Sequence, residues 1–274
     1  MKTSISLLYS DLLPHRKKLF HKVVTSKMFA KKSPEAVFAD LKAFGLDGFE
    51  LLLPSFLKIN DEDLLSIKKL SQKYHLPVLS VHQTLRFLTT TKLKEIERFF
   101  EIAEKLQAKV IVLHISCAGR QIFNNKYVHE LHQLEKKYKI KAAFENNEKY
   151  AASYLQPHRW HETKFSDLIN KMDFHITLDT VHLAHSGGDI VQFYKKNKSR
   201  IMNVHLSDYR YHPLNASLRP MRYKHMPLGD GELPIEDFVA LLKREEYNGL
   251  LTLELHSGLD GVEQSMGMIK KYRK

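Results

Sequence analysis

The chain has 274 residues, 43% of them hydrophobic, and a formal net charge of +12. This length suffices for one sizeable core, and no Ser-, Gly- or Pro-rich linker interrupts it, so we expect one domain spanning residues 1–274. The single cysteine, Cys117, excludes an intrachain disulfide, and no run reaches the roughly 18 apolar residues of a membrane span. We also find no signal-peptide pattern, and we expect a cytoplasmic protein without a membrane partner.

Eight short apolar runs, rich in Val, Ile and Leu, recur along the chain. Most are continuous rather than alternating, which is typical of parallel strands that are covered on both faces. The runs cover residues 5–10, 48–53, 77–82, 110–114, 141–146, 175–180, 201–206 and 250–255.

The segments between these runs show helical spacing. Residues 33–45 offer Ser33 as an N-cap, Pro34 in the first turn and Gly45 as a stop signal. Residues 92–107, 127–138 and 234–247 place apolar side chains on one helical stripe. Eight strands alternating with helices predict an α/β fold, a single (β/α)8 barrel. The alternative, an open doubly wound sheet that binds a dinucleotide, would need a G-x-G-x-x-G turn after the first strand, and the sequence has none there.

Two connections are unusually long and contain aromatic and basic side chains. They cover residues 147–164, which include Trp160, and residues 207–233, which include Arg210 and Arg222. Long loops of this kind are usually functional, so we expect them to cover a substrate. Trp160 would form a wall of the pocket, and the arginines could bind a phosphate group.

The third to eighth predicted strands all end in His, Glu or Asp. In a (β/α)8 barrel these strand ends meet at one rim and form the active site. Any one such residue is often only a helix cap or a hydrogen-bonded loop residue. Together, however, converging carboxylates repel each other, and a divalent cation with mixed O and N ligands relieves that repulsion. We therefore predict a site for a divalent metal (Mn, Mg, Co or Zn) among His82, His114, Glu145, Asp179, His182, His205, Asp208 and Glu254, with His225 in the following loop.

The motifs "VHQ", "VLH", "FEN", "LDTVH", "VHLSD" and "HMPLGDGELP" together resemble the xylose isomerase-like TIM barrel superfamily over nearly the whole chain. In its sugar phosphate isomerase/epimerase branch, one divalent metal is held by residues that correspond to Glu145, Asp179, His205 and Glu254. The resemblance implies a metal-dependent isomerase or epimerase of a small sugar or sugar phosphate. Glu145 and Glu254 would act as acid and base through a metal-stabilised enediolate. Contacts with substrate are then implied for His82, His114, His182, Arg210 and Trp160.

A related branch, the endonuclease IV-like nucleases, implies a different function. There, three zinc ions serve a phosphodiesterase that acts on abasic DNA, a partner that suits the +12 charge. Two positions depart from that pattern: Tyr223 stands where the third zinc would need an aspartate, and Leu85 replaces an aromatic residue that enters DNA. A barrel that keeps the metal site without catalysis is a third interpretation. The zinc ligands implied are His82, His114, Glu145, Asp179, His182, His205, His225 and Glu254.

Overall fold

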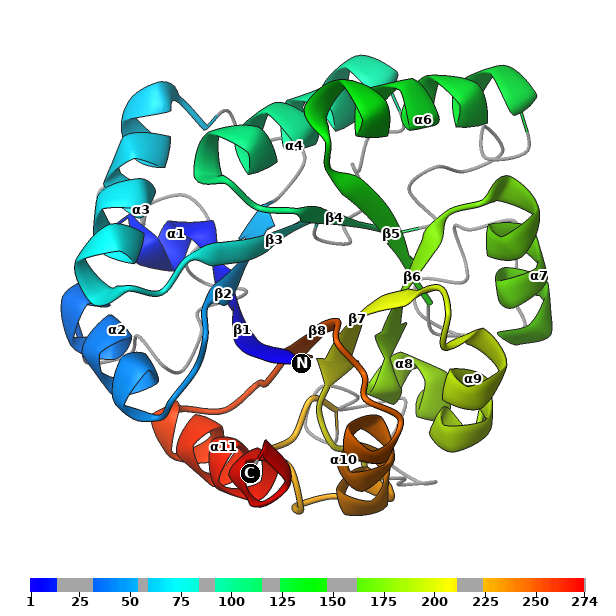
Figure 1. The fold of residues 1–274 in the computed structure, drawn as a ribbon. Coiled ribbons are helices and arrows are strands. Elements are labelled where there is room, and N and C mark those ends of the chain that lie inside the picture. The colour runs from blue at the N-terminus through cyan, green and yellow to red at the C-terminus, as the bar shows by residue number, and fades with distance from the viewer. Residues whose placement is uncertain are drawn as a thin grey trace, which may run out of the picture.

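The computed structural model describes residues 1–13, 32–53, 59–83, 92–114, 124–146, 162–210 and 224–273. Eight parallel strands close into a barrel in chain order, and helices surround it (Figure 1). The predicted (β/α)8 barrel is therefore confirmed. The strands are β1 (Lys2–Leu8), β2 (Phe49–Leu53), β3 (Val78–Gln83), β4 (Val110–His114), β5 (Lys141–Glu145), β6 (His175–Asp179), β7 (Ile201–Leu206) and β8 (Leu250–Leu253). The helices are α1 (Tyr9–Leu12), α2 (Pro34–Ala43), α3 (Asp61–Tyr74), α4 (Leu93–Leu106), α6 (Asn125–Tyr138), α7 (Glu162–Met172), α8 (Thr180–His185), α9 (Ile190–Asn197), α10 (Ile235–Arg244) and α11 (Leu259–Arg273).

The main hydrophobic core includes the side chains packed between the strands and the helices. Phe38 on α2 packs edge-on against Phe49 on β2, with ring centroids 5.2 Å apart. Phe144 on β5 packs in the same way against Phe174, at 5.1 Å. All four rings are buried, and aromatic side chains contribute large apolar areas to such a core. This packing holds the strands in place, and with them the polar side chains at their ends.

Local signals in the sequence set several element boundaries. Ser33 caps α2, because its side chain accepts a hydrogen bond from Ala36 N at 3.3 Å. Gly45 follows that helix with a φ of +83°, a left-handed conformation that glycine adopts without steric cost. The first strand differs from the prediction, since it begins at Lys2 and ends at Leu8. Its extension contains Ser4, a buried polar residue whose Oγ lies 2.8 Å from Thr252 Oγ1, so the apolar pattern did not reveal it.

The inside of the barrel is divided into an apolar and a polar part. Val110, Val112 and Ala143 form a small buried cluster, separate from the main core. A polar layer also lies inside the barrel and includes Glu50 and Asn203, both fully buried. Because barrel interiors are mostly filled by branched apolar residues, this polar layer is unusual. It connects directly to the site described below.

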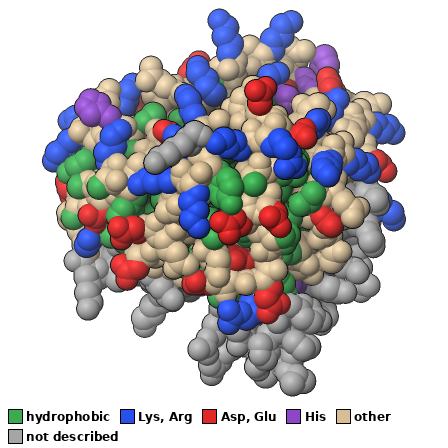
Figure 2. Space-filling model, turned by 60° about the horizontal axis from the view of Figure 1, so that its bottom comes forward, with side chains coloured by type: hydrophobic (Ala, Val, Ile, Leu, Met, Phe, Trp, Pro, Cys, Tyr) green, Lys and Arg blue, Asp and Glu red, His purple; other side chains and the backbone are tan. Residues whose placement is uncertain are grey.

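The surface carries charges of both signs. Figure 2 shows lysine and arginine side chains scattered over the visible face, with acidic side chains among them. This agrees with the dispersed basic residues of the sequence and does not mark one basic patch on that face. In the part of the chain that the structure describes, none of the helices has the length and apolar character needed to cross a membrane.

Candidate metal centre

Glu145, the last residue of β5, lies at the centre of the site. Its Oε2 is 3.1 Å from His82 Nε2 and 3.3 Å from His114 Nδ1. Its Oε1 is 3.2 Å from His205 Nδ1 and 3.3 Å from His182 Nδ1. The Glu145 side chain is fully buried, so four imidazoles replace the water that would otherwise solvate it.

The register of the parallel strands brings these residues to one level of the barrel. β4 and β5 pair His114 with Glu145, and β6 and β7 pair Asp179 with His205. Glu254 directly follows β8, and its backbone N–H donates to Leu206 O on β7. Its Oε2 lies 2.9 Å from His205 Nδ1. The strand ends thus bring these side chains close together at one rim of the barrel.

Ligand atoms of the correct kind converge in four groups in this part of the barrel. Within each group, one N or O atom per residue lies within 4.8 Å of the others. Glu145 belongs to two of the groups and Asp179 to two, so the groups form one continuous centre. The groups are His82, His114 and Glu145; Glu145, Asp179, His205 and Glu254; Asp179, His182 and His225; and Glu50, His82 and His205.

Three carboxylate oxygens show that these residues fit a divalent cation. Glu145 Oε2, Asp179 Oδ2 and Glu254 Oε2 are buried, and none has a hydrogen-bond partner among the described residues. Imidazole nitrogens lie 2.9 to 3.8 Å from these oxygens without forming a hydrogen bond to them. Buried oxygens of this kind are costly unless a donor or a metal satisfies them. Mixed carboxylate and imidazole donors suit zinc and other divalent transition metals.

Asp179 shows how the fold presents one oxygen to the site. Its Oδ1 accepts the backbone N–H of His182 at 2.7 Å, which caps α8, so Oδ2 is left for the ligand group. Asn146 holds the backbone of Asp179 with two hydrogen bonds, at 2.7 and 3.0 Å. The backbone O of Asn146 also lies 3.0 Å from His182 Nδ1. Asn146 thus supports two residues of the site.

Burial and charge shift the pKa values of the site strongly. Burial raises the pKa of Asp179 to about 8, and repulsion from Glu145 and Glu254 adds to this effect. Burial lowers the pKa of His82, but the carboxylates of Glu50 and Glu145 outweigh it and raise the pKa to about 9. Burial also disfavours ionised Glu145, yet the surrounding imidazoles hold its pKa well below the usual range. Without a cation, the centre therefore retains protons that a metal would displace.

The loop after β7 is held by Asp208, which belongs to none of the four ligand groups. Its carboxylate accepts backbone N–H groups from Tyr209, Gly229, Gly231 and Leu233, at 2.8 to 3.1 Å. A Cβ on Gly231 would lie 2.2 Å from Asp208 Oδ1, so this close approach requires glycine. The role of Asp208 is thus to shape the loop.

That loop brings His225 to the site. The backbone of Asp208 pairs with Met226, the residue after His225, through two hydrogen bonds of 3.0 Å. His225 Nδ1 lies 3.2 Å from Ser207 Oγ. The ring of His225 is 4.6 Å from that of His256, a residue that strand-end reasoning did not single out.

Other predicted site residues lie elsewhere or outside the description. Arg210 is exposed and donates a hydrogen bond to Asp230 O. Trp160, Arg222 and Tyr223 lie outside the described residues. Glu50 was missed as a site residue, although a charge inside the apolar run of residues 48–53 was the available signal. It is fully buried, 3.2 Å from His82 Nδ1 and 3.1 Å from His205 Nε2.

Known proteins share this fold and sequence pattern. An inosose dehydratase from Clostridium perfringens is 26% identical over 199 residues, which is 61% of this chain and 66% of that protein. A D-tagatose 3-epimerase-like protein superposes with a TM-score of 0.70 at 19% identity, covering 99% of this chain and 97% of its own. An AP endonuclease, family 2, from Brucella melitensis superposes with a TM-score of 0.66 at 13% identity, covering 100% of this chain and 99% of its own. At such identities the structural likeness shows the fold alone. The description "xylose isomerase-like TIM barrel" matches residues 38–272, and the chain belongs to this family.

Proposed function

We propose that this protein is a metal-dependent isomerase or epimerase of a small sugar or sugar phosphate. The observation that carries the proposal is the group formed by Glu145, Asp179, His205 and Glu254. Two carboxylates of this group lie close to the same atom, His205 Nδ1, at 3.2 Å for Glu145 and 2.9 Å for Glu254. The inosose dehydratase relative and the epimerase-like solved structure are consistent with a sugar substrate.

The two glutamates would share the proton transfer. A divalent cation bound by the group would polarise the substrate carbonyl and stabilise the enediolate that forms when the neighbouring C–H loses its proton. Glu145 and Glu254 come from β5 and from the end of β8, so they approach the centre from different strands. One would take the proton from the substrate carbon and the other would return a proton. The Glu254 side chain is 18% exposed, which leaves it open to a substrate, whereas Glu145 is fully buried.

Solvent deuterium exchange tests this proposal. The protein, loaded with Mn, Mg, Co or Zn in turn, is incubated in D2O with a panel of ketoses and their phosphates, and NMR follows deuterium at carbon. We expect exchange with at least one sugar, and a loss of about 10²- to 10⁴-fold in Glu254→Gln. Glu263→Gln, an exposed glutamate on α11, is the matched control. Absence of exchange with every metal and sugar would sink the proposal.

A zinc-dependent phosphodiesterase that acts on abasic DNA is a second candidate, and a specific observation favours it. Two further groups provide metal ligands that a one-metal isomerase does not need. One consists of His82, His114 and Glu145, and the other of Asp179, His182 and His225. The test is incision of a duplex with one abasic site by zinc-loaded protein, with and without chelator. Incision that chelator suppresses would support this candidate, and an uncut duplex would exclude it.

A further inference from the structure

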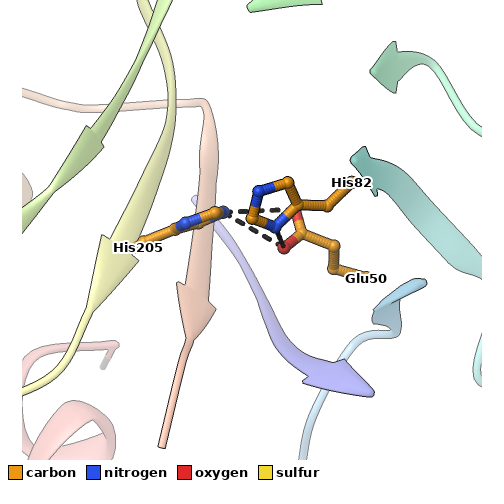
Figure 3. Close-up of side chains that lie close together, drawn as sticks. All are labelled: Glu50, His82 and His205. Carbon is orange, nitrogen blue, oxygen red and sulfur yellow. Dashed lines mark hydrogen bonds and ion pairs between the residues drawn. The ribbon is translucent and has the colours of Figure 1, made fainter. Parts of the chain in front are cut away.

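Glu50 lies inside the barrel beside the metal centre. It is the second residue of β2, and its register partners are Ser6 on β1 and Ser80 on β3. His82 pairs with Leu52, two residues later in β2, so Glu50 lies closer to the start of the strands. Figure 3 shows its carboxylate next to the ring of His82, with His205 reaching toward both from β7.

Three neighbouring side chains fix the carboxylate of Glu50. Ser6 Oγ donates to Oε1 at 2.8 Å, Ser80 Oγ donates to Oε2 at 2.7 Å, and Asn203 Nδ2 donates to Oε2 at 3.2 Å. These three donors hold the carboxylate in place beside the two imidazoles, and a metal ion bound by Glu50 would have to displace some of them. Although Glu50, His82 and His205 offer ligand atoms within 4.8 Å of one another, Glu50 is therefore better placed to orient the imidazoles than to bind a metal itself.

Glu50 contacts one histidine from each of two ligand groups. Its Oε1 lies 3.2 Å from His82 Nδ1 and 3.1 Å from His205 Nε2. The opposite nitrogen of each ring faces Glu145: His82 Nε2 at 3.1 Å and His205 Nδ1 at 3.2 Å. His205 Nε2 forms a hydrogen bond with Glu50 Oε2 at 3.3 Å, whereas His82 Nδ1 lies beside Oε1 without the geometry of a hydrogen bond. A ring that turns its N–H toward Glu50 presents its lone pair to the centre, and ligating histidines commonly bond to a carboxylate in this way.

We infer that Glu50 is a positioning residue shared by two metal sites, one that includes His82 and one that includes His205. The inference rests on the metal dependence proposed above for the site that includes His205, and on the further ligand group of His82, His114 and Glu145 for the second site. A single buried carboxylate then sets the ring orientation and the bound nitrogen in both sites at once. Loss of Glu50 weakens both sites together, whereas loss of His114 or Glu254 affects only the group to which that residue belongs.

The test measures metal binding rather than activity. Metal-free wild type and Glu50→Gln are titrated with Zn²⁺ and Co²⁺ by calorimetry, and the visible spectrum of bound Co²⁺ reports the ligand geometry. Gln keeps the size of the side chain but can present only one acceptor oxygen. We expect two equivalents in wild type, and in Glu50→Gln a loss of about 10- to 100-fold in affinity for both, with a changed Co²⁺ spectrum.

Thr252→Val is the matched control. Thr252 donates to Asn203 Oδ1 at 2.8 Å and so belongs to the same buried network. It pairs with His205 through the backbone register of β7 and β8, but among the described residues no side-chain hydrogen bond or ion pair joins it to His82 or His205. It should lower stability and leave both metal affinities unchanged. If Glu50→Gln does not fold, Ser80→Ala takes its place in the test. It removes a hydrogen-bond donor that anchors Glu50, so it should lower the affinity for both metal equivalents in parallel.

The outcomes separate this inference from the proposed function. Wild type that binds no divalent metal overturns the proposed function. Wild type that binds a single equivalent overturns the sharing of Glu50 between two sites and leaves the proposed function standing. Two equivalents in wild type with unchanged affinities in Glu50→Gln, or a loss confined to one equivalent, overturn the shared positioning role and leave the proposed function standing.

Discussion

The Nε2 atoms of His82 and His114 lie 3.1 Å apart inside the barrel. If both nitrogens carry a proton, the two N–H groups oppose each other, and if neither does, the two lone pairs repel. One shared proton resolves the conflict, and so does a cation that accepts both lone pairs. Glu145 Oε2 lies within 3.3 Å of both rings and adds a negative charge at the same place. The second solution matches the donor preference of zinc.

His114→Ala is therefore expected to remove one metal site and spare another. His114 belongs to the group with His82 and Glu145, but not to the group with Asp179, His205 and Glu254. Metal analysis of zinc-loaded protein should show a loss of about one equivalent per chain. His129→Ala, an exposed histidine on α6, should retain the wild-type count. An unchanged count in His114→Ala would show that its group holds no metal.

Metal-free protein is expected to become less stable as pH rises from about 6.5 to 9. The folded-state pKa of Asp179 is raised from 3.8 to about 8, and that of His82 from 6.5 to about 9. Both groups bind protons more tightly in the folded state than in the unfolded state. Their contribution to folding stability is therefore complete below the pKa of the unfolded state, and it is lost as pH rises through the pKa of the folded state. Denaturant unfolding in chelator at pH 6.5 and 9 measures this. A midpoint that rises with pH would contradict it.

Bound metal should reverse this trend. A cation replaces the protons on Asp179 and His82, so zinc loading at pH 7 is expected to release protons, and zinc affinity should increase as pH rises toward 9. Calorimetry in buffers of different ionisation enthalpy counts the released protons. A binding enthalpy that does not depend on the buffer would argue against proton displacement.

Asp208→Asn is expected to destabilise the loop that carries His225. Asp208 Oδ2 accepts hydrogen bonds from the N–H groups of Gly229 and Gly231. An asparagine would replace this oxygen or Oδ1 with an NH2 group, which would then point at backbone N–H groups that it cannot accept from. A buried group left unpaired costs about 1–3 kcal/mol. Urea unfolding measures the loss, with Asp260→Asn, at an exposed position on α11, as the control. Equal midpoints for the two variants would refute the role of Asp208.

The strand ends could be predicted from sequence because they depend on local pattern. Continuous apolar runs marked all eight strands, and the barrel then required residues such as Glu145 and Asp179 to meet at one rim. Pairwise distances, and the sharing of Glu145 between two groups, depend on register and ring orientation, which no local pattern encodes.

Glu50 was missed for a different reason. Its partners Ser6, Ser80 and Asn203 are small polar residues from three other strands, and each alone looks like an ordinary strand residue. Pairing of adjacent strands places Ser6 and Ser80 beside Glu50, and closure of the barrel brings Asn203 to it from β7. The polar interior that they form with Glu50 is therefore a property of the tertiary structure, beyond the reach of periodicity arguments.

Asp179→Asn is expected to separate metal binding from folding. Asp179 caps α8 through Oδ1, and asparagine is an equally good N-cap, so the variant should fold. It lacks the carboxylate whose pKa burial and neighbouring charges raise to about 8. At pH 9 the metal-free variant should therefore be more stable than metal-free wild type, while zinc affinity falls. Asp179→Ala loses the cap as well and should cost about 1 kcal/mol in stability. Urea unfolding and zinc titration of both variants measure these differences, and an Asp179→Asn protein that binds zinc like wild type would remove Asp179 from the metal site.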